Sequence, residues 1–291
     1  MQIVKDSYRS IHPLFSEIEE LYALTSVKEQ QKTLLRPVFK SVFKPVFELF
    51  HKYTGVEYKV EYTDAQPAKN TIFEVPLTDN SVIVCYSGGK DSTATVRYYK
   101  KRGYDVVLYH LKGINKTYKD EWKNVTKKAE LLDVPVVFEE VQLIGNQEWV
   151  EHPLKNWIIA GRALQYGIAH HITSHIAFGN FKTSTLDNDP FEVCGGDCKE
   201  MWNVYNNIVD TVIPGFKVHT PLENMQSTLD ILLQHKDIAV QCQSCIGPYR
   251  YRDYLHDNNV KKYGVQLPEK HCGSCWTSRS EERRVGKECR S

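Results

Sequence analysis

Residues 81–92, SVIVCYSGGKDS, join a short apolar run to a glycine-rich turn and the start of a helix. The run from Ser81 to Tyr86 is short and β-branched, which is typical of a buried strand. The segment from Thr93 to Lys101 has helical spacing. A strand, a glycine turn and a helix in this order present backbone N–H groups and the positive end of a helix dipole to an anion. The stretch therefore predicts a phosphate-binding loop.

Each residue type in this loop suits an anion. The two glycines allow a tight turn and a close backbone approach, the serines offer hydroxyl donors, and the lysine supplies a point charge. The aspartate can hold Mg²⁺ or cap the helix, and an ordinary glycine turn with a helix cap is the structural alternative. We predict Lys90 and Asp91 to be catalytic. The predicted ATP-binding residues are Tyr86, Ser87, Gly88, Gly89, Lys90, Asp91, Ser92, Thr93 and Lys112, the last because it ends the next predicted strand.

Further along the chain, apolar β-branched runs alternate with helical patterns. Strands are predicted over 105–111, 134–139 and 172–178, and helices over 118–132 and 158–170. This alternation predicts an α/β fold with a doubly wound parallel sheet, in which ligands bind at the carboxyl ends of the strands near the switch point. The glycine loop lies at such an end.

The first 80 residues have a different pattern. Apolar residues at helical spacing from Ile11 to Tyr53 predict two or three helices, and Pro45 is expected to bend or divide one of them. Glu57 to Tyr62 alternates like a strand. We expect a domain joint near Asn80. The predicted units are a helical N-terminal extension (1–80), the nucleotide-binding α/β domain (81–235), a C-terminal metal-binding segment (236–279) and a tail (280–291).

Composition sets limits on the partners of this chain. The 37 basic and 36 acidic side chains nearly cancel, which argues against a nucleic-acid partner. The N-terminus lacks the pattern of a secretory signal, and no apolar run approaches the ~20 residues that cross a bilayer. We therefore expect a cytoplasmic protein without a membrane partner, and leave a homodimer open.

Four of the eight cysteines form two Cys-x-x-Cys pairs, Cys242 with Cys245 and Cys272 with Cys275. Disulfides are rare in the cytoplasm, so such pairs predict a tetrahedral, structural Zn²⁺ site. A redox pair or an iron–sulfur cluster is the alternative.

The spacing of Ser87-Gly88-Gly89-Lys90-Asp91-Ser92 differs from that of the Walker A and dinucleotide-binding loops. It resembles the PP-loop of the ATP pyrophosphatase superfamily, whose fold is called adenine nucleotide α-hydrolase-like or HUP-like. The resemblance implies cleavage of ATP between its α and β phosphates and transfer of AMP to an oxygen atom of the substrate.

Within that superfamily the motif order resembles 7-cyano-7-deazaguanine synthase. The matching residues are Pro153-Leu154-Lys155-Asn156, a strand ending at Gly179, Asp197-Cys198-Lys199, Pro221-Leu222, Ser244-Cys245 and Cys272 to Cys275. Lysines replace two arginines of the family, and Ser278 replaces a zinc-ligating cysteine, for which Cys242 can substitute. The resemblance implies ATP, Mg²⁺ and Zn²⁺ as cofactors, and a deazapurine acid with ammonia as substrates. It also implies Asn156, Asp197 and Lys199 as substrate-binding residues, although Asp197 suits a helix N-cap equally well.

Two other functions remain open. One is a PP-loop enzyme that thiolates tRNA, and the other is a defence-associated relative that joins a deazaguanine to a protein amine. The last twelve residues, 280–291, resemble translated sequencing-adapter readthrough, so we expect them to be no part of the fold.

Overall fold

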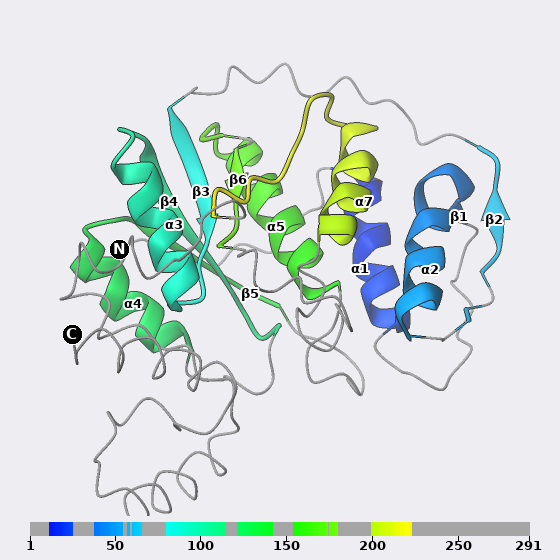
Figure 1. Ribbon diagram of the computed structural model, residues 1–291, viewed down its shortest axis with the longest axis horizontal. Coiled ribbons are helices and arrows are strands. Elements are labelled where there is room, and N and C mark those ends of the chain that lie inside the picture. Colours follow the sequence, from blue (N-terminus) through cyan, green and yellow to red (C-terminus); the bar gives the residue numbers. More distant parts are fainter. Residues whose placement is uncertain are drawn as a thin grey trace, which may run out of the picture.

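The computed structural model describes residues 12–25, 38–54, 57–58, 60–65, 80–114, 121–141, 154–173, 175–179 and 199–222. Its centre is a four-stranded parallel sheet with the order β5-β4-β3-β6 (Figure 1). The strands are β3 (Ser81–Cys85), β4 (Asp105–Lys112), β5 (Val136–Glu140) and β6 (Ile176–Ala177). The α/β class and the parallel sheet predicted from the alternation of patterns are confirmed.

Both faces of the sheet are buried, and the alternation of side chains along β3 shows how. Val82 and Val84 belong to a hydrophobic cluster with helices α3 (Lys90–Lys100) and α4 (Glu121–Leu132). Ile83 and Cys85 point to the other face and belong to a cluster with α5 (Lys155–Ala169). Successive side chains of a strand point to opposite faces, so an unbroken apolar run is what a strand between two helical layers requires.

The chain winds around this sheet in two directions. From β3 it runs through α3 and β4 to α4 and β5, and it then returns through α5 to β6 on the other side of β3. The switch point of the sheet therefore lies between β3 and β6, and the predicted loop begins at the carboxyl end of β3.

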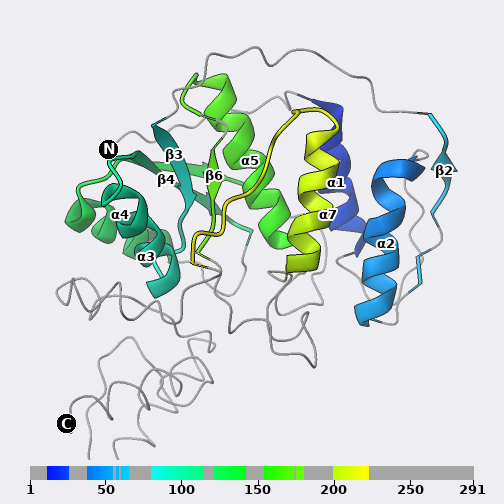
Figure 2. The ribbon, with the colours of Figure 1, turned by 45° about the horizontal axis from the view of Figure 1, so that its top comes forward.

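The remaining helices extend the layer formed by α5 (Figure 2). α1 (Pro13–Thr25) packs against α5, and α2 (Lys40–Thr54) packs against α7 (Lys199–Asp210). β1 (Val38–Phe39) and β2 (Tyr62–Thr63) form a separate parallel pair. Buried residues of α1, α2, α5 and α7 belong to one hydrophobic cluster, so these N-terminal helices share a core with the sheet.

Two predicted strands are shorter than expected. The strand predicted over 172–178 is confined to Ile176–Ala177, because the chain is still leaving α5 at Ile172, whose N–H donates to the carbonyl of Gly167 at 2.8 Å. The prediction of a strand over 57–62 is wrong in its bounds. Of the described residues in this range only Tyr62 belongs to β2, which pairs with the two residues of β1. Alternation in a sequence cannot show how long the partner strand is.

Pro45 lies inside α2, which runs from Lys40 to Thr54, so of the two predicted effects of this proline the division of the helix does not occur. Proline inside a helix costs about 3 kcal/mol or more through the lost hydrogen bond and the ring clash. The same helix buries the apolar side chains of Val42, Phe43, Val46, Phe47, Leu49 and Phe50. At roughly 1.5–3 kcal/mol for each buried side chain, this packing outweighs the cost of Pro45.

Within the described ranges, no helix is both long enough and apolar enough to cross a membrane.

Candidate functional site

The candidate site is the loop that connects β3 to α3. At its start the N–H of Tyr86 donates to the carbonyl of Tyr109 at 2.8 Å, which continues the sheet pairing one residue past β3. The carbonyl of Tyr86 accepts a hydrogen bond from Nδ1 of buried His110 at 2.9 Å. These bonds to β4 hold the first residue of the loop in place.

Gly88 makes the turn. Its φ is +76°, in the left-handed region that side chains with a Cβ rarely adopt. An added Cβ would lie 3.6 Å from Val125, an ordinary contact, so the backbone conformation and not the space requires glycine here. Gly89 then acts as the N-cap of α3 without a side-chain cap, and the helix begins at Lys90, three residues before the predicted start at Thr93.

Hydroxyl groups of the first helical turn close the loop onto itself. Thr93 Oγ1 donates to the carbonyl of Gly89 at 2.7 Å and also pairs with the hydroxyl of Tyr86 at 2.9 Å. Ser92 Oγ lies 3.2 Å from the same carbonyl and 3.3 Å from Ser87 Oγ. Ser87 Oγ in turn accepts the N–H of Gly89 at 3.3 Å. The contacts of the two serine hydroxyls, at 3.2 and 3.3 Å, are long and therefore weak, so they can be exchanged for bonds to a ligand.

Gly179, just after β6, brings the neighbouring strand against the loop. A Cβ built on Gly179 would lie 2.5 Å from the carbonyl carbon of Asp91 and 2.6 Å from the nitrogen of Ser92. Only glycine permits this approach. The resemblance named a strand ending at this glycine, and its backbone lies beside the first turn of α3 at the switch point.

Lys128 of α4 also reaches the loop, and Nζ of this side chain donates to the carbonyl of Gly88. The residue is 2% exposed. We did not predict it from the sequence, although there is a signal. Val125, Lys128, Ala129 and Leu132 follow the spacing of an apolar helical stripe, so a lysine occupies a core position of α4.

The other residues predicted to bind the nucleotide are Asp91, Lys112 and Lys90. Asp91 is in the first turn of α3 and partly buried. Lys112 ends β4, and its Nζ lies 4.5 Å from the ring centroid of Trp122 and 4.6 Å from that of Phe138. These are cation–π distances. The structure thus joins the loop residues to one another and places Lys112 over two aromatic rings. Only the backbone of Lys90 is described, at the start of α3.

The predicted substrate residues are less fully described. Asn156 is buried in the first turn of α5, across the sheet from α3. Lys199 starts α7, with only its backbone described, and Asp197 lies outside the described residues. So do the four predicted zinc ligands, Cys242, Cys245, Cys272 and Cys275. The described part of the chain holds no group of three or more metal-binding side chains.

Burial sets the protonation of the groups behind the loop. It lowers the pKa of His110 from its ordinary 6.5 to about 4, so the imidazole is neutral at pH 7 and donates its Nδ1–H to the carbonyl of Tyr86. Burial also raises the pKa of Cys85 well above its ordinary value. That thiol is therefore unsuited to be a nucleophile.

The groups that the loop presents are suited to binding an anion. It combines a left-handed glycine turn, unblocked by a side-chain cap, with the N-terminus of an eleven-residue helix and two serine hydroxyls. Such an arrangement suits a phosphate group, and the carboxylate of Asp91 is of the type that holds Mg²⁺ beside one.

No family model matches the chain, and no curated protein matches it. Similar solved structures include a predicted subunit of a tRNA methyltransferase from Methanocaldococcus jannaschii, at 18% identity over 66% of this chain and 91% of that chain, with a TM-score of 0.32. Another is NMN synthetase from Francisella tularensis, at 16% identity over 71% of this chain and 87% of that chain, with a TM-score of 0.36. Similarities this weak carry no conclusion, so the fold rests on the strand order and the site on the loop geometry.

Proposed function

We propose that this protein is an ATP-dependent adenylating enzyme that releases pyrophosphate. The observation that carries the proposal is the position of the Ser87–Ser92 loop. It leaves the carboxyl end of β3 at the switch point of a doubly wound sheet, and it contains the left-handed Gly88 two residues before α3 begins. Ligands of such sheets bind at this position.

The resemblance of the loop to the PP-loop favours the pyrophosphate part of ATP as its ligand. In that reading the loop N–H groups and hydroxyls hold the β and γ phosphates, and Lys90 adds positive charge. Mg²⁺ would be held by Asp91 and would neutralise charge on the phosphates. Catalysis then consists mainly of holding the α phosphate against the attacking oxygen and stabilising the pyrophosphate that leaves.

For the substrate, we propose 7-carboxy-7-deazaguanine or a close analogue, with ammonia as nucleophile. A carboxylate oxygen attacks the α phosphate and pyrophosphate leaves. Ammonia then attacks the acyl carbon, AMP leaves, and a proton is lost to give the amide. The amide oxygen then attacks the α phosphate of a second ATP and pyrophosphate leaves, after which loss of AMP with two N–H protons gives the nitrile. Asn156, Asp197 and Lys199 are proposed to bind the deazapurine. This part rests on the sequence resemblance.

The test is a product assay with ATP, Mg²⁺, ammonia and 7-carboxy-7-deazaguanine. AMP, pyrophosphate and the nitrile are the expected products. Asp91→Asn should lower turnover at least about tenfold, because the carboxylate that would hold Mg²⁺ beside the phosphates is replaced by a weaker, neutral ligand. Lys101→Ala is the matched control, since Lys101 is exposed at the far end of the same helix, and it should keep full activity.

Three outcomes separate the levels of the proposal. ADP as the only nucleotide product contradicts adenylation. AMP and pyrophosphate can instead form only with a protein amine as acceptor, or only with tRNA and a sulfur donor. Either result would support adenylation but contradict synthesis of the deazaguanine nitrile. No ATP turnover with any of these acceptors contradicts the enzyme assignment.

A further inference from the structure

Lys128 occupies a position where a lysine is costly. It lies on the inner stripe of α4 between Val125 and Leu132, which are 0% and 2% exposed, and it is itself 2% exposed. An ammonium group removed from water costs several kcal/mol unless hydrogen bonds compensate for the lost hydration. The arrangement therefore requires a specific acceptor, and the carbonyl of Gly88 is one.

The contact joins two elements that are separate in sequence. Lys128 and Gly88 are 40 residues apart, and Nζ lies 3.8 Å from the position that a Cβ on Gly88 would occupy. Val125, one turn earlier on α4, lies 3.6 Å from the same position. The inner face of α4 thus forms one wall behind the turn.

The geometry of the peptide bond makes this contact relevant to anion binding. In a planar trans peptide the C=O of one residue and the N–H of the next point in opposite directions. With the Gly88 oxygen held on the α4 side, the Gly89 N–H is directed away from α4, where it meets Ser87 Oγ at 3.3 Å. A peptide between two glycines rotates easily, since neither residue has a Cβ to restrict it. The opposite orientation would present the carbonyl oxygen to the phosphate and repel it.

We propose that Lys128 is a positioning residue, which holds the Gly88–Gly89 peptide with its N–H toward the phosphate-binding side of the loop. The inference deepens the proposed function and rests on it. Lys128 acts through the backbone of the loop and need not touch the nucleotide.

The decisive variant is Lys128→Met, which keeps the length of the side chain and removes its donors. Lys127→Met is the matched control, because Lys127 is exposed on the same helix. Affinity for inorganic pyrophosphate with Mg²⁺, measured by calorimetry, should fall about tenfold or more in Lys128→Met, the equivalent of one lost N–H contact, and stay within about twofold in Lys127→Met. Lys128→Arg, which keeps a donor, should recover part of the affinity. In steady-state assays KM for ATP should rise more than kcat falls.

A spectroscopic measurement on the wild-type protein keeps the inference testable if Lys128→Met does not fold. The Gly89 amide resonance should shift when pyrophosphate is added, as expected for an N–H that donates to the ligand. Wild-type protein that binds neither pyrophosphate nor ATP contradicts the proposed function itself. If the wild type binds but its Gly89 resonance does not move, only the proposed role of Lys128 is contradicted. The same holds if Lys128→Met binds with the affinity of the wild type.

Discussion

His110 is an ionisable residue placed inside the layer between the sheet and α4. The imidazole packs against Phe138, with ring centroids 5.8 Å apart, and donates to the carbonyl of Tyr86 at the start of the β3–α3 loop. It serves as a neutral hydrogen-bond donor behind the site, since burial keeps it uncharged at pH 7. Its position in a β-rich apolar run gave no sign of this role.

This burial predicts a loss of stability in acid. The pKa of His110 is about 4 in the folded protein and 6.5 ordinarily, so below pH 6.5 the unfolded chain binds a proton that the folded chain does not. The free energy of unfolding should fall as pH drops from about 6.5 to about 4, by up to roughly 3 kcal/mol from this residue. The pKa values of His175 and His219 are also lowered by burial and add to the effect in the same direction.

Urea unfolding at about pH 7.5 and about pH 4.5 checks the prediction in wild type and in His110→Gln, which keeps an N–H donor but does not titrate. The variant should lose less stability between the two pH values. An equal loss in both proteins would show that His110 has no part in the acid sensitivity.

At the scale of elements, Arg162 joins α5 to α1 and β5 through ion pairs. Arg162 of α5 binds Glu19 of α1 through Nε at 2.5 Å and Nη2 at 2.8 Å, and it binds Glu139 of β5 through Nη1 at 2.6 Å. The hydroxyl of Tyr109 donates to the other oxygen of Glu139. Burial and the neighbouring Glu139 raise the pKa of Tyr109 well above its ordinary value, so the hydroxyl keeps its proton.

Removing this arginine should be costly, because Glu139 is only 12% exposed and would lose its countercharge. We expect Arg162→Met to lower the free energy of unfolding by about 2–3 kcal/mol, below the value for a fully buried pair because Glu19 is partly exposed. Lys44→Met is the control. The pair of Lys44 with Glu48 lies on the exposed side of α2, and its loss should cost less than about 0.5 kcal/mol. Equal effects of the two changes in urea unfolding would contradict this difference.

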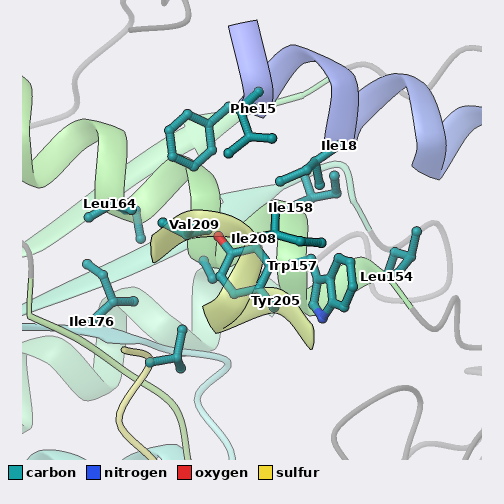
Figure 3. Close-up of a cluster of buried hydrophobic side chains, with 14 of the residues drawn as sticks. Phe15, Ile18, Leu154, Trp157, Ile158, Leu164, Ile176, Tyr205, Ile208 and Val209 are labelled. Carbon is teal, nitrogen blue, oxygen red and sulfur yellow. The ribbon is translucent and has the colours of Figure 1, made fainter. Parts of the chain in front are cut away.

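On the scale of the whole molecule, the N-terminal helices complete the core. Phe15 and Ile18 of α1 belong to the same buried cluster as Leu154, Trp157 and Ile158 at the start of α5 and Tyr205 of α7 (Figure 3). Among the α1 side chains that the structure describes, five apolar ones are buried: Leu14, Phe15, Ile18, Leu21 and Tyr22. At roughly 1.5–3 kcal/mol each, α1 alone contributes an amount comparable to the ~5–15 kcal/mol net stability of a typical protein.

A chain that starts at residue 80 should therefore fail to unfold cooperatively and should bind a hydrophobic dye such as ANS. In that chain the faces of α5 and α7 that pack against α1 and α2 would be exposed to water. Deletion of residues 280–291, which the sequence predicts to be no part of the fold, is the matched control and should leave the melting temperature unchanged. A cooperative thermal transition of the shorter chain, at the temperature of the full chain, would show that the first 79 residues are a separate unit.

The sequence alone determined the parallel α/β sheet and the position of the Ser87–Ser92 loop between β3 and α3. Both are encoded locally. The unbroken apolar run at 81–86 requires helices on both faces of its strand, and the two glycines after it require a turn. The sequence also predicted most elements within a few residues. The exceptions are the two strands whose length depended on a distant partner, and β1, where Val38 and Phe39 were predicted to be helical.

Tertiary structure decided which side chains support the loop. Lys128 reaches Gly88 across 40 residues, and Arg162 reaches Glu19 across 143. Gly179 lies against Asp91 only because β6 returns beside β3. Periodicity in a sequence shows which face of an element is apolar, but not which element packs there. The partners of a buried charge depend on that packing, and so they could be identified only from the folded chain.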